Sequence, residues 1–93
     1  AEVSHFYSKD KLTYAAAGER DFMVDFTLTE LEERLARSGF FRAHRGYLVN
    51  LQHVKEVILY TRNSFSLILD DAAGTEIPLS KAAAGELREL LGY

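Results

Sequence analysis

The stretch that decides the fold of this chain is Phe40-Phe41-Arg42-Ala43-His44-Arg45-Gly46-Tyr47-Leu48-Val49-Asn50-Leu51-Gln52-His53-Val54. It mixes aromatic and aliphatic side chains, which favour burial, with arginines and histidines, which favour water. No acidic residue lies between Ala36 and Lys55, although the 93-residue chain has a formal net charge of −3. A cationic strip that is anchored by apolar side chains is typical of a surface that meets an anion.

The composition predicts a single folded domain. The length allows one hydrophobic core, and 47% apolar with 27% charged residues is ordinary for a globular protein. Without cysteine there is no disulfide framework and no thiolate metal site, so the cytoplasm is the expected compartment. No signal peptide is visible, and no apolar run approaches the roughly 18 residues of a membrane span. Because the chain begins at Ala1 rather than methionine, we expect a domain excised from a longer protein.

The mild acidity argues against a protein that coats nucleic acid without selectivity, because such proteins are usually basic overall. If this chain binds DNA, its positive charge must be confined to one face.

Alternating apolar residues and turn residues predict a mostly β chain. We expect strands at Val3–Lys9, Leu12–Ala17, Arg20–Phe26, Val54–Thr61, Ser64–Asp70 and Thr75–Leu79. The central stretch between the third and fourth of these is expected to form short extended pieces that are broken at Gly46. These six or seven short strands are joined mostly by hairpins, which predicts antiparallel sheets.

Two short helices complete the expected fold class, which is α+β with strands in the majority. Thr27 and Glu30 form a capping box at the start of the first helix, and Gly39 ends it after about three turns. Ser80 caps the second helix and Gly92 ends it. The apolar stripe of this second helix is formed by Ala83, Leu87, Leu90 and Leu91.

The spaced pattern Phe40-x-Arg42-x-His44-Arg45-x-Tyr47-Leu48-Val49-Asn50-Leu51 resembles the core motif of the LytTR-type DNA-binding domain, the output module of many bacterial response regulators. Three flanking features agree with that family: a leucine-rich helix at Leu28–Leu35, a β-rich stretch at Val54–Leu69, and Ile77-Pro78-Leu79-Ser80-Lys81 at the start of the last helix. The resemblance runs from about Val3 to the C-terminus. It implies an elongated arrangement of small antiparallel sheets with a helix on the side. Sequences of the family normally begin one or two strands further upstream, so it also implies that the first strand or strands are missing and that one sheet has an open edge.

An enzyme is not expected. The chain has no nucleophile elbow, P-loop or dinucleotide fingerprint. Asp70-Asp71 is a carboxylate pair, but adjacent residues at a strand-to-turn step point apart, which indicates a solvated turn. His5, His44 and His53 lack the spacing of metal ligands. We therefore expect neither a metal site nor a cofactor.

Arg42, His44 and Arg45 are candidate DNA-binding residues. Gly46 breaks the extended register, so Arg45 lies at a bend where its guanidinium is free to meet a guanine edge or a phosphate. The alternative is a surface ion pair, for example with Glu56. The residues alone do not decide between DNA contact and an ion pair for Arg45, whereas the resemblance favours DNA contact. His44 either bonds the backbone and fixes the loop or donates to a phosphate.

The other candidate DNA contacts have structural alternatives as well. Tyr47 either packs or touches DNA, and Asn50 either satisfies backbone groups or touches DNA. Ser80-Lys81 lies at a helix N-terminus, which acts as a cap and can also hold a phosphate. Lys9 and Lys11 lie at the tip of the first hairpin, where lysines commonly serve solubility.

The resemblance implies that the major groove of double-stranded DNA is read from loops rather than from a recognition helix. Three segments would contact successive grooves, namely Ser8–Lys11, Arg42–Tyr47 and the start of the last helix. The base-reading positions fall on Lys11, Arg45 and Lys81.

We therefore expect a sequence-specific DNA-binding output domain of a bacterial transcription regulator, controlled by a separate sensor or receiver domain. The resemblance implies two copies on paired direct repeats, and the isolated domain is expected to be monomeric. The alternative is a β-rich interaction module that docks an acidic protein through the cationic strip. Exposure of Phe40 or Tyr47 would favour that alternative.

Overall fold

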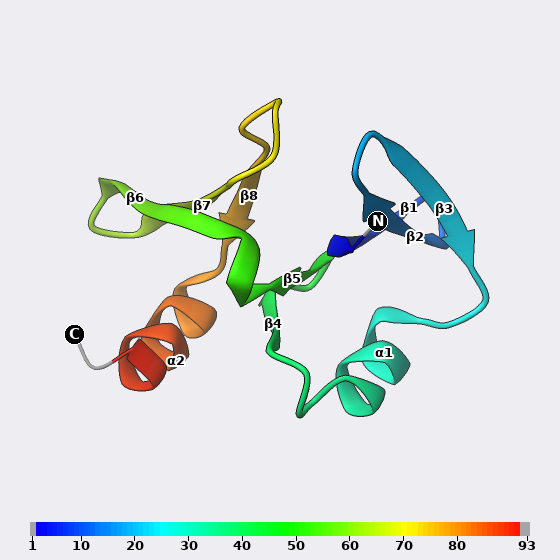
Figure 1. Cartoon of the computed structure of the whole chain (residues 1–93). Helices are drawn as coiled ribbons and strands as arrows, with labels where there is room; N and C mark the ends of the chain where they lie inside the picture. Colours follow the sequence, from blue (N-terminus) through cyan, green and yellow to red (C-terminus); the bar gives the residue numbers. More distant parts are fainter. Residues whose placement is uncertain (1, 92–93) are drawn as a thin grey trace.

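Two antiparallel sheets and two α-helices form the computed structural model of this protein, which describes residues 2–91 (Figure 1). One sheet has five strands and the other has three. This confirms the predicted class of a mostly β protein with two short helices. The extents along the principal axes are 35 × 28 × 25 Å, so the elongation is modest. Neither helix, within the described part, is long and apolar enough to cross a bilayer.

The five-stranded sheet has the order β3-β2-β1-β5-β4. Its strands are β1 (Val3–Lys9), β2 (Leu12–Ala17), β3 (Arg20–Val24), β4 (Phe40–His44) and β5 (Tyr47–Asn50). The predicted bounds of the first two strands are confirmed, and the third ends two residues earlier than predicted. β1 is an interior strand that pairs with both β2 and β5, so the open edges of this sheet are β3 and β4.

The three-stranded sheet is formed by β6 (Val54–Thr61), β7 (Ser64–Leu69) and β8 (Glu76–Leu79), in that order. A short 3₁₀-helix, η1 (Leu51–His53), leads the chain from β5 into β6. The cationic strip of the sequence therefore forms β4 and β5 of the first sheet, and its last residues link that sheet to the second.

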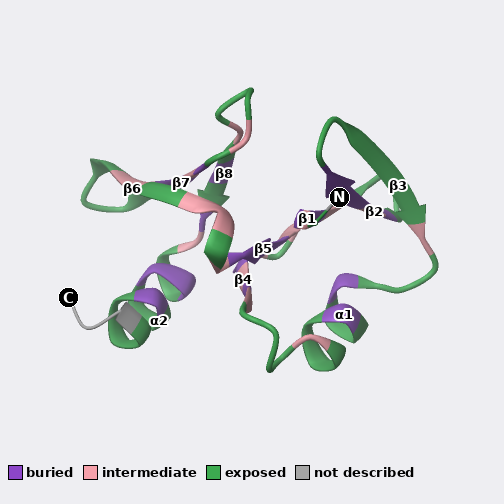
Figure 2. Ribbon diagram, in the orientation of Figure 1, coloured by how far each residue is buried: buried purple, intermediate pink, exposed green. Residues whose placement is uncertain are grey.

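The strands at the middle of the molecule are covered on both faces, because two apolar clusters meet there. Leu48 is fully buried in the cluster with Phe6, Ala15, Leu28 and Leu31, beneath the first helix. Val49, the next residue, points the other way into the larger cluster, which joins both sheets to the second helix. That cluster contains Phe41, Ala43, Val49, Leu67, Leu69, Ile77, Leu79, Ala83, Ala84 and Leu87. Figure 2 shows β5 as a buried strand at the centre of the fold.

The first helix, α1 (Leu28–Arg34), begins with the predicted capping box. Thr27 Oγ1 accepts a hydrogen bond from the Glu30 N–H (3.1 Å), and Glu30 Oε1 accepts one from the Thr27 N–H (2.9 Å). The predicted end at Gly39 is wrong, because helical geometry is lost at Leu35. Successive turns then lead to Gly39, whose φ of +79° redirects the chain into β4.

The second helix, α2 (Lys81–Leu91), is capped as predicted, with Ser80 Oγ accepting from the Ala83 N–H (3.1 Å). Its apolar stripe is shorter than predicted. Ala83 and Leu87 are buried, but Leu90 is 65% exposed because the last turn extends beyond the core. Ala84 is buried in addition. The predicted contributions of the Leu91 side chain and of Gly92 lie outside the described residues.

Candidate nucleic-acid interface

Two backbone hydrogen bonds bring three separate loops together at one end of the five-stranded sheet. The Ser8 N–H donates to the Gly46 carbonyl (3.0 Å), which joins the β1–β2 hairpin to the β4–β5 turn. The Ser80 N–H donates to the Ala43 carbonyl (2.8 Å), which joins the start of α2 to the end of β4. These loops carry Lys9 and Lys11, then Arg45, then Lys81, in residues that are all exposed. We call this end of the molecule the basic end.

The tip of the first hairpin is a two-residue turn in an unusual conformation. Lys9 pairs with Leu12, and the two residues between them, Asp10 and Lys11, have φ values of +53° and +68°. Two positive φ angles define a type I′ turn, for which Asp-Gly and Asn-Gly are the preferred pairs. A lysine in place of glycine costs about 1 kcal/mol, and such strain is concentrated at functional sites. The backbone conformation at this position does not favour lysine, so the side chain is the reason to expect a lysine there.

Arg45 lies at the tip of the β4–β5 turn and is exposed. Neither Glu56 nor any other carboxylate in the described part of the chain forms an ion pair with it. The surface ion pair that the sequence left open is thus not formed, and the guanidinium remains available to a ligand.

His44 closes the same turn from inside. Its Nδ1 atom accepts a hydrogen bond from the Gly46 N–H (3.2 Å), so that nitrogen carries no proton. The proton of the neutral ring is then on Nε2, which is a donor. The two predicted roles, fixing the loop and donating to a phosphate, are therefore chemically compatible.

The Arg42 side chain points toward the β4–β5 turn and bonds its backbone. Its Nε donates to the His44 carbonyl (3.1 Å), and its Nη2 donates to the Arg45 carbonyl (2.6 Å). Its Nη1 lies 3.0 Å from Oε1 of Glu32 on α1. Only 24% of the arginine side chain is exposed. The contacts of Arg42 are thus with the protein on three sides.

Tyr47 and Asn50 have mainly structural surroundings. Tyr47 is half-buried against the larger apolar cluster, with its ring 6.0 Å from that of His44. Asn50 is buried, and its side chain accepts from the Gln52 N–H (3.0 Å) and donates to the Val3 carbonyl (3.2 Å). Phe40 packs against the smaller cluster. Because Phe40 and Tyr47 both pack, the condition that would favour a protein-docking module is not met.

The start of α2 borders a basic hollow that sequence reasoning missed. Its volume is about 320 Å³, and its lining consists of Arg62, Phe65, Lys81, Ala84, Gly85 and Arg88. Lys81 was a predicted site residue, whereas Arg62 and Arg88 were not. Arg62 lies in the connection between β6 and β7, and only the packing of that hairpin against α2 brings it to Lys81. No local pattern in the sequence indicates this neighbour.

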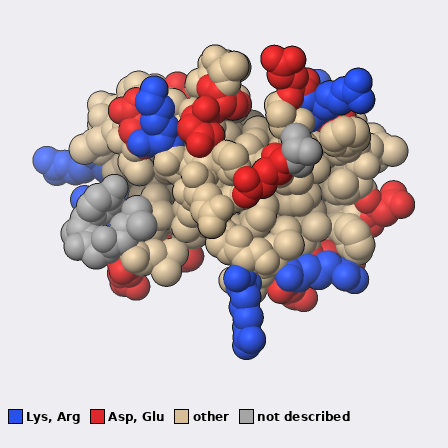
Figure 3. Space-filling view, in the orientation of Figure 1, with Lys and Arg blue, Asp and Glu red and all other residues tan. Residues whose placement is uncertain are grey.

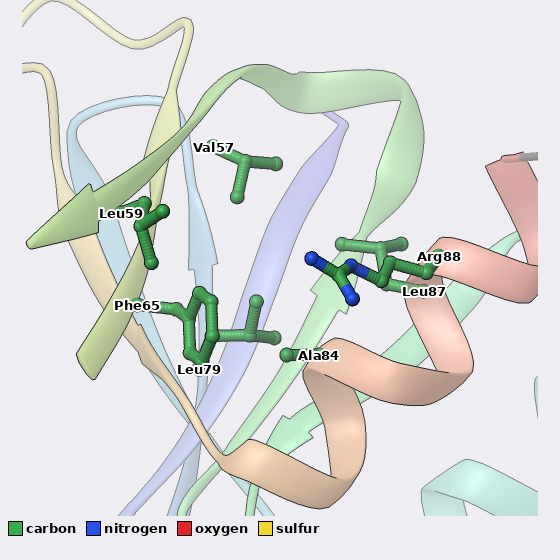
Figure 4. A pocket seen from close by; sticks show the side chains of 7 residues that line it. All are labelled: Val57, Leu59, Phe65, Leu79, Ala84, Leu87 and Arg88. Carbon is green, nitrogen blue, oxygen red and sulfur yellow. The ribbon is translucent and has the colours of Figure 1, made fainter. Parts of the chain in front are cut away.

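A larger hollow of about 520 Å³ lies between the β6–β7 hairpin and α2 (Figure 4). Its lining is apolar apart from Arg88, which also borders the basic hollow. The other lining side chains are Val57, Leu59, Phe65, Leu79, Ala84 and Leu87. An apolar lining does not suit an anion, so this hollow is distinct in character from the basic end.

The remaining acidic and histidine side chains are engaged in structural contacts. His53 Nδ1 lies 2.9 Å from Asp70 Oδ1, and His53 Nε2 lies 3.3 Å from Glu2 Oε2, the latter an ion pair without hydrogen-bond geometry. The hydrogen bond that the imidazole donates to Asp70 is the main cause that raises the pKa of His53. Asp71 accepts from the N–H (2.8 Å) and hydroxyl of Thr75, and these bonds lower its pKa. Asp70-Asp71 is therefore not the simply solvated turn that the sequence predicted.

Burial lowers the pKa of His5, which contacts the Ser4 hydroxyl (3.0 Å). Residues 2–91 contain no group of three His, Asp or Glu side chains arranged to hold a metal ion. On the face drawn in Figure 3, acidic and basic side chains are interspersed.

Comparison with known proteins identifies relatives along nearly the whole chain. The family model described as the LytTr DNA-binding domain matches residues 1–92. The heme-containing CO-sensing transcriptional regulator RcoM 1 of Paraburkholderia xenovorans is 31% identical over 98% of this chain. The sensory transduction protein LytT of Bacillus subtilis is 36% identical over 78% of it. A solved LytTr DNA-binding domain from Bacillus cereus superimposes with a TM-score of 0.88 at 35% identity, covering 98% of this chain and 82% of that one.

The matched region is only part of each curated relative. It covers 34% of RcoM 1 and 30% of LytT, so this chain spans about a third of their length.

Proposed function

Because this chain belongs to the family of LytTr DNA-binding domains, we propose that it binds double-stranded DNA sequence-specifically as the output domain of a bacterial transcription regulator. One observation carries the proposal: the Ser8–Gly46 and Ser80–Ala43 hydrogen bonds hold three loops that bear cations together at the basic end. A duplex can meet loops that share one end of the molecule, whereas it could not meet loops on opposite faces.

Sequence is read from the major groove by Lys11, Arg45 and Lys81, one from each loop. All three residues are exposed. An arginine fork matches the O6 and N7 acceptors of guanine, and a lysine donates to the same atoms. Arg45 is the strongest of the three candidates, because its planar fork can bond both guanine acceptors at once, which a lysine ammonium cannot do in the same fixed geometry.

Phosphates are held around these three positions. Lys9 lies beside Lys11 on the hairpin, and the Nε2–H of His44 is the free donor of its ring. The first turn of α2, capped by Ser80, offers backbone N–H groups and the positive end of the helix dipole. Arg62 and Arg88 extend the positive charge beyond Lys81. Such contacts supply affinity without sequence preference.

The parent protein provides the regulatory input in a separate domain. Among the relatives, one is a heme-containing CO sensor and another is a sensory transduction protein, and this chain matches only about a third of each. We propose that two copies occupy paired direct repeats in a promoter, and that the isolated domain is monomeric.

The proposal is tested by selecting binding sites from a random DNA pool and then comparing two variants on the selected and on scrambled DNA. Arg45→Ala should cost roughly 1–3 kcal/mol on the selected site and relax the preference at one base pair. Lys9→Ala should weaken both DNAs alike and reduce the salt dependence by about one phosphate contact.

Failure to enrich any sequence would contradict sequence-specific binding. Equal loss on both DNAs for Arg45→Ala would contradict its role as a base reader. Weak salt dependence of the wild-type protein would contradict an interface built on phosphate contacts.

A further inference from the structure

The β4–β5 turn that presents Arg45 is held by a side chain that itself belongs to the family motif. Arg42 donates to the carbonyls of His44 and Arg45, so its guanidinium spans the turn from inside. These two carbonyls and the Glu32 carboxylate occupy three separate nitrogens of Arg42. A planar fork with one hydrogen bond on each of its three nitrogens fixes the backbone that carries Arg45.

The anchor of this arrangement lies on a helix, not on a loop. Glu32 follows Leu31, which is buried in the apolar cluster beneath α1, and the start of α1 is fixed by the Thr27–Glu30 capping box. Figure 1 shows α1 beside the β4 end of the sheet. The contact between Glu32 and Arg42 thus connects a rigid element to a turn, which is the arrangement that gives a binding side chain a defined position.

The electrostatics of the pair disfavour a direct phosphate contact by Arg42. A carboxylate 3.0 Å from the guanidinium cancels most of its charge, and its own charge repels phosphate. Arg45, at the tip of the β4–β5 turn, forms no ion pair with a carboxylate of the described residues. The two arginines of the motif therefore have different surroundings and different chemistry.

We propose that Glu32 and Arg42 form a positioning pair that holds the His44–Gly46 turn in the shape in which Arg45 meets DNA. This inference rests on the proposed function and assigns a role to an acidic residue on the helix. It separates the two arginines into a positioning residue, Arg42, and a base-reading residue, Arg45.

Removal of the Glu32 charge provides a test in which electrostatics and positioning predict opposite signs. Glu32→Gln deletes a negative charge, which by itself should strengthen binding to every DNA. Positioning predicts instead that affinity for the selected site falls about three- to tenfold, because the turn loses its anchor. Glu33→Gln is the matched control, since Glu33 is exposed on the same helix and forms no ion pair with Arg42. Affinity for scrambled DNA should not fall in either variant.

Arg42→Lys tests the same idea without changing charge. An ammonium group cannot bridge two carbonyls and a carboxylate in one plane, so discrimination between selected and scrambled DNA should fall while the salt slope stays at the wild-type value. The double variant Glu32→Gln/Arg42→Lys should discriminate no worse than Arg42→Lys alone, because both changes break one unit.

Several results would overturn the inference. One is Glu32→Gln binding the selected site as well as Glu33→Gln does. Another is Arg42→Gln losing affinity equally on both DNAs with a salt slope reduced by about one contact, as the loss of a phosphate ligand would. A third is Arg42→Lys discriminating between selected and scrambled DNA as well as the wild type does.

The amide shifts of Arg45 and Gly46 in the DNA-free protein distinguish this failure from failure of the proposed function. Positioning requires these shifts to move in Glu32→Gln and not in Glu33→Gln, whether or not any DNA sequence is selected. Unchanged shifts in Glu32→Gln overturn the pair. Absence of a selected sequence with the wild-type protein contradicts the proposed function alone.

Discussion

Lys11 is, at the scale of one residue, a departure from local conformational preference. Its φ of +68° suits glycine, and the preceding Asp10 already has the first residue type of a favoured type I′ pair. The chain nevertheless has a long cationic side chain at this position. The fold tolerates this strain, and its effect on the free energy of unfolding is large enough to measure.

Lys11→Gly is expected to separate stability from DNA binding. Removing the strain should raise the free energy of unfolding by about 1 kcal/mol, while the loss of the ammonium group should cost roughly 1–3 kcal/mol on the selected site. Urea titration and binding assays on the same preparation measure the two effects. Lys11→Asn is the control, because asparagine tolerates this conformation but lacks the charge. A stability below that of the wild type would show that the strain argument is wrong.

At the scale of secondary-structure elements, sequence reasoning succeeded where the determinant is local. Thr27 and Glu30 are three residues apart and form their box within one turn, and Ser80 caps α2 in the same way. It failed where the determinant is tertiary. Gly39 looked like the end of α1, but the chain leaves helical geometry at Leu35 to enter the sheet. Leu90 lies on the apolar stripe of its helix, yet the core does not extend far enough to cover it.

For the candidate site too, sequence reasoning succeeded with local features and failed with those that depend on tertiary contacts. The motif placed Arg45 correctly at an exposed bend. It did not distinguish Arg42 from Arg45, because the contact that occupies Arg42 comes from Glu32 on a different element. Arg62 was missed since its nearness to Lys81 depends on how a distant hairpin packs against α2.

The two helix caps offer a matched pair of substitutions. Thr27→Ala and Ser80→Ala should each lower the free energy of unfolding by about 1 kcal/mol, because each removes one N-cap acceptor. Only Ser80→Ala should weaken binding to random-sequence DNA, since the first turn of α2 belongs to the basic end. Thermal melts and filter binding provide the comparison. Equal affinities of the two variants for random DNA would remove α2 from the interface.

At the scale of the whole molecule, the two sheets are joined by a histidine at the end of β1 that lies away from the basic end. His53 in η1 faces Asp70 at the end of β7 and Glu2 beside β1. These three side chains border a hollow of about 360 Å³, which Glu19 and Asp71 also line. The protonated imidazolium is thus the form that this acidic surrounding stabilises.

The contribution of His53 to stability should depend on pH with a defined sign. Its pKa is raised above the ordinary 6.5, chiefly by the bond to Asp70. The stabilisation is therefore complete below about pH 6.5 and is lost as the pH rises through the higher value of the folded protein. The difference in free energy of unfolding between wild type and His53→Gln should be on the order of 0.5 kcal/mol larger near pH 5.5 than near pH 8.5.

Urea titrations of both proteins at the two pH values measure this difference. The buried His5 changes stability in the opposite direction, because burial lowers its pKa, and its effect cancels since both proteins contain it. A difference that grows toward alkaline pH would contradict the role assigned to His53.

The interior position of β1 has a consequence for the protein while it is still being made. β1 leaves the ribosome before β5, so β1 has no neighbour on its second side until residues 47–50 follow. An unpaired strand flank of this kind favours contacts with other chains until β5 has been made. Ser80, which completes the third loop, is translated later still. The basic end is therefore assembled only after residue 80 has been added to the growing chain.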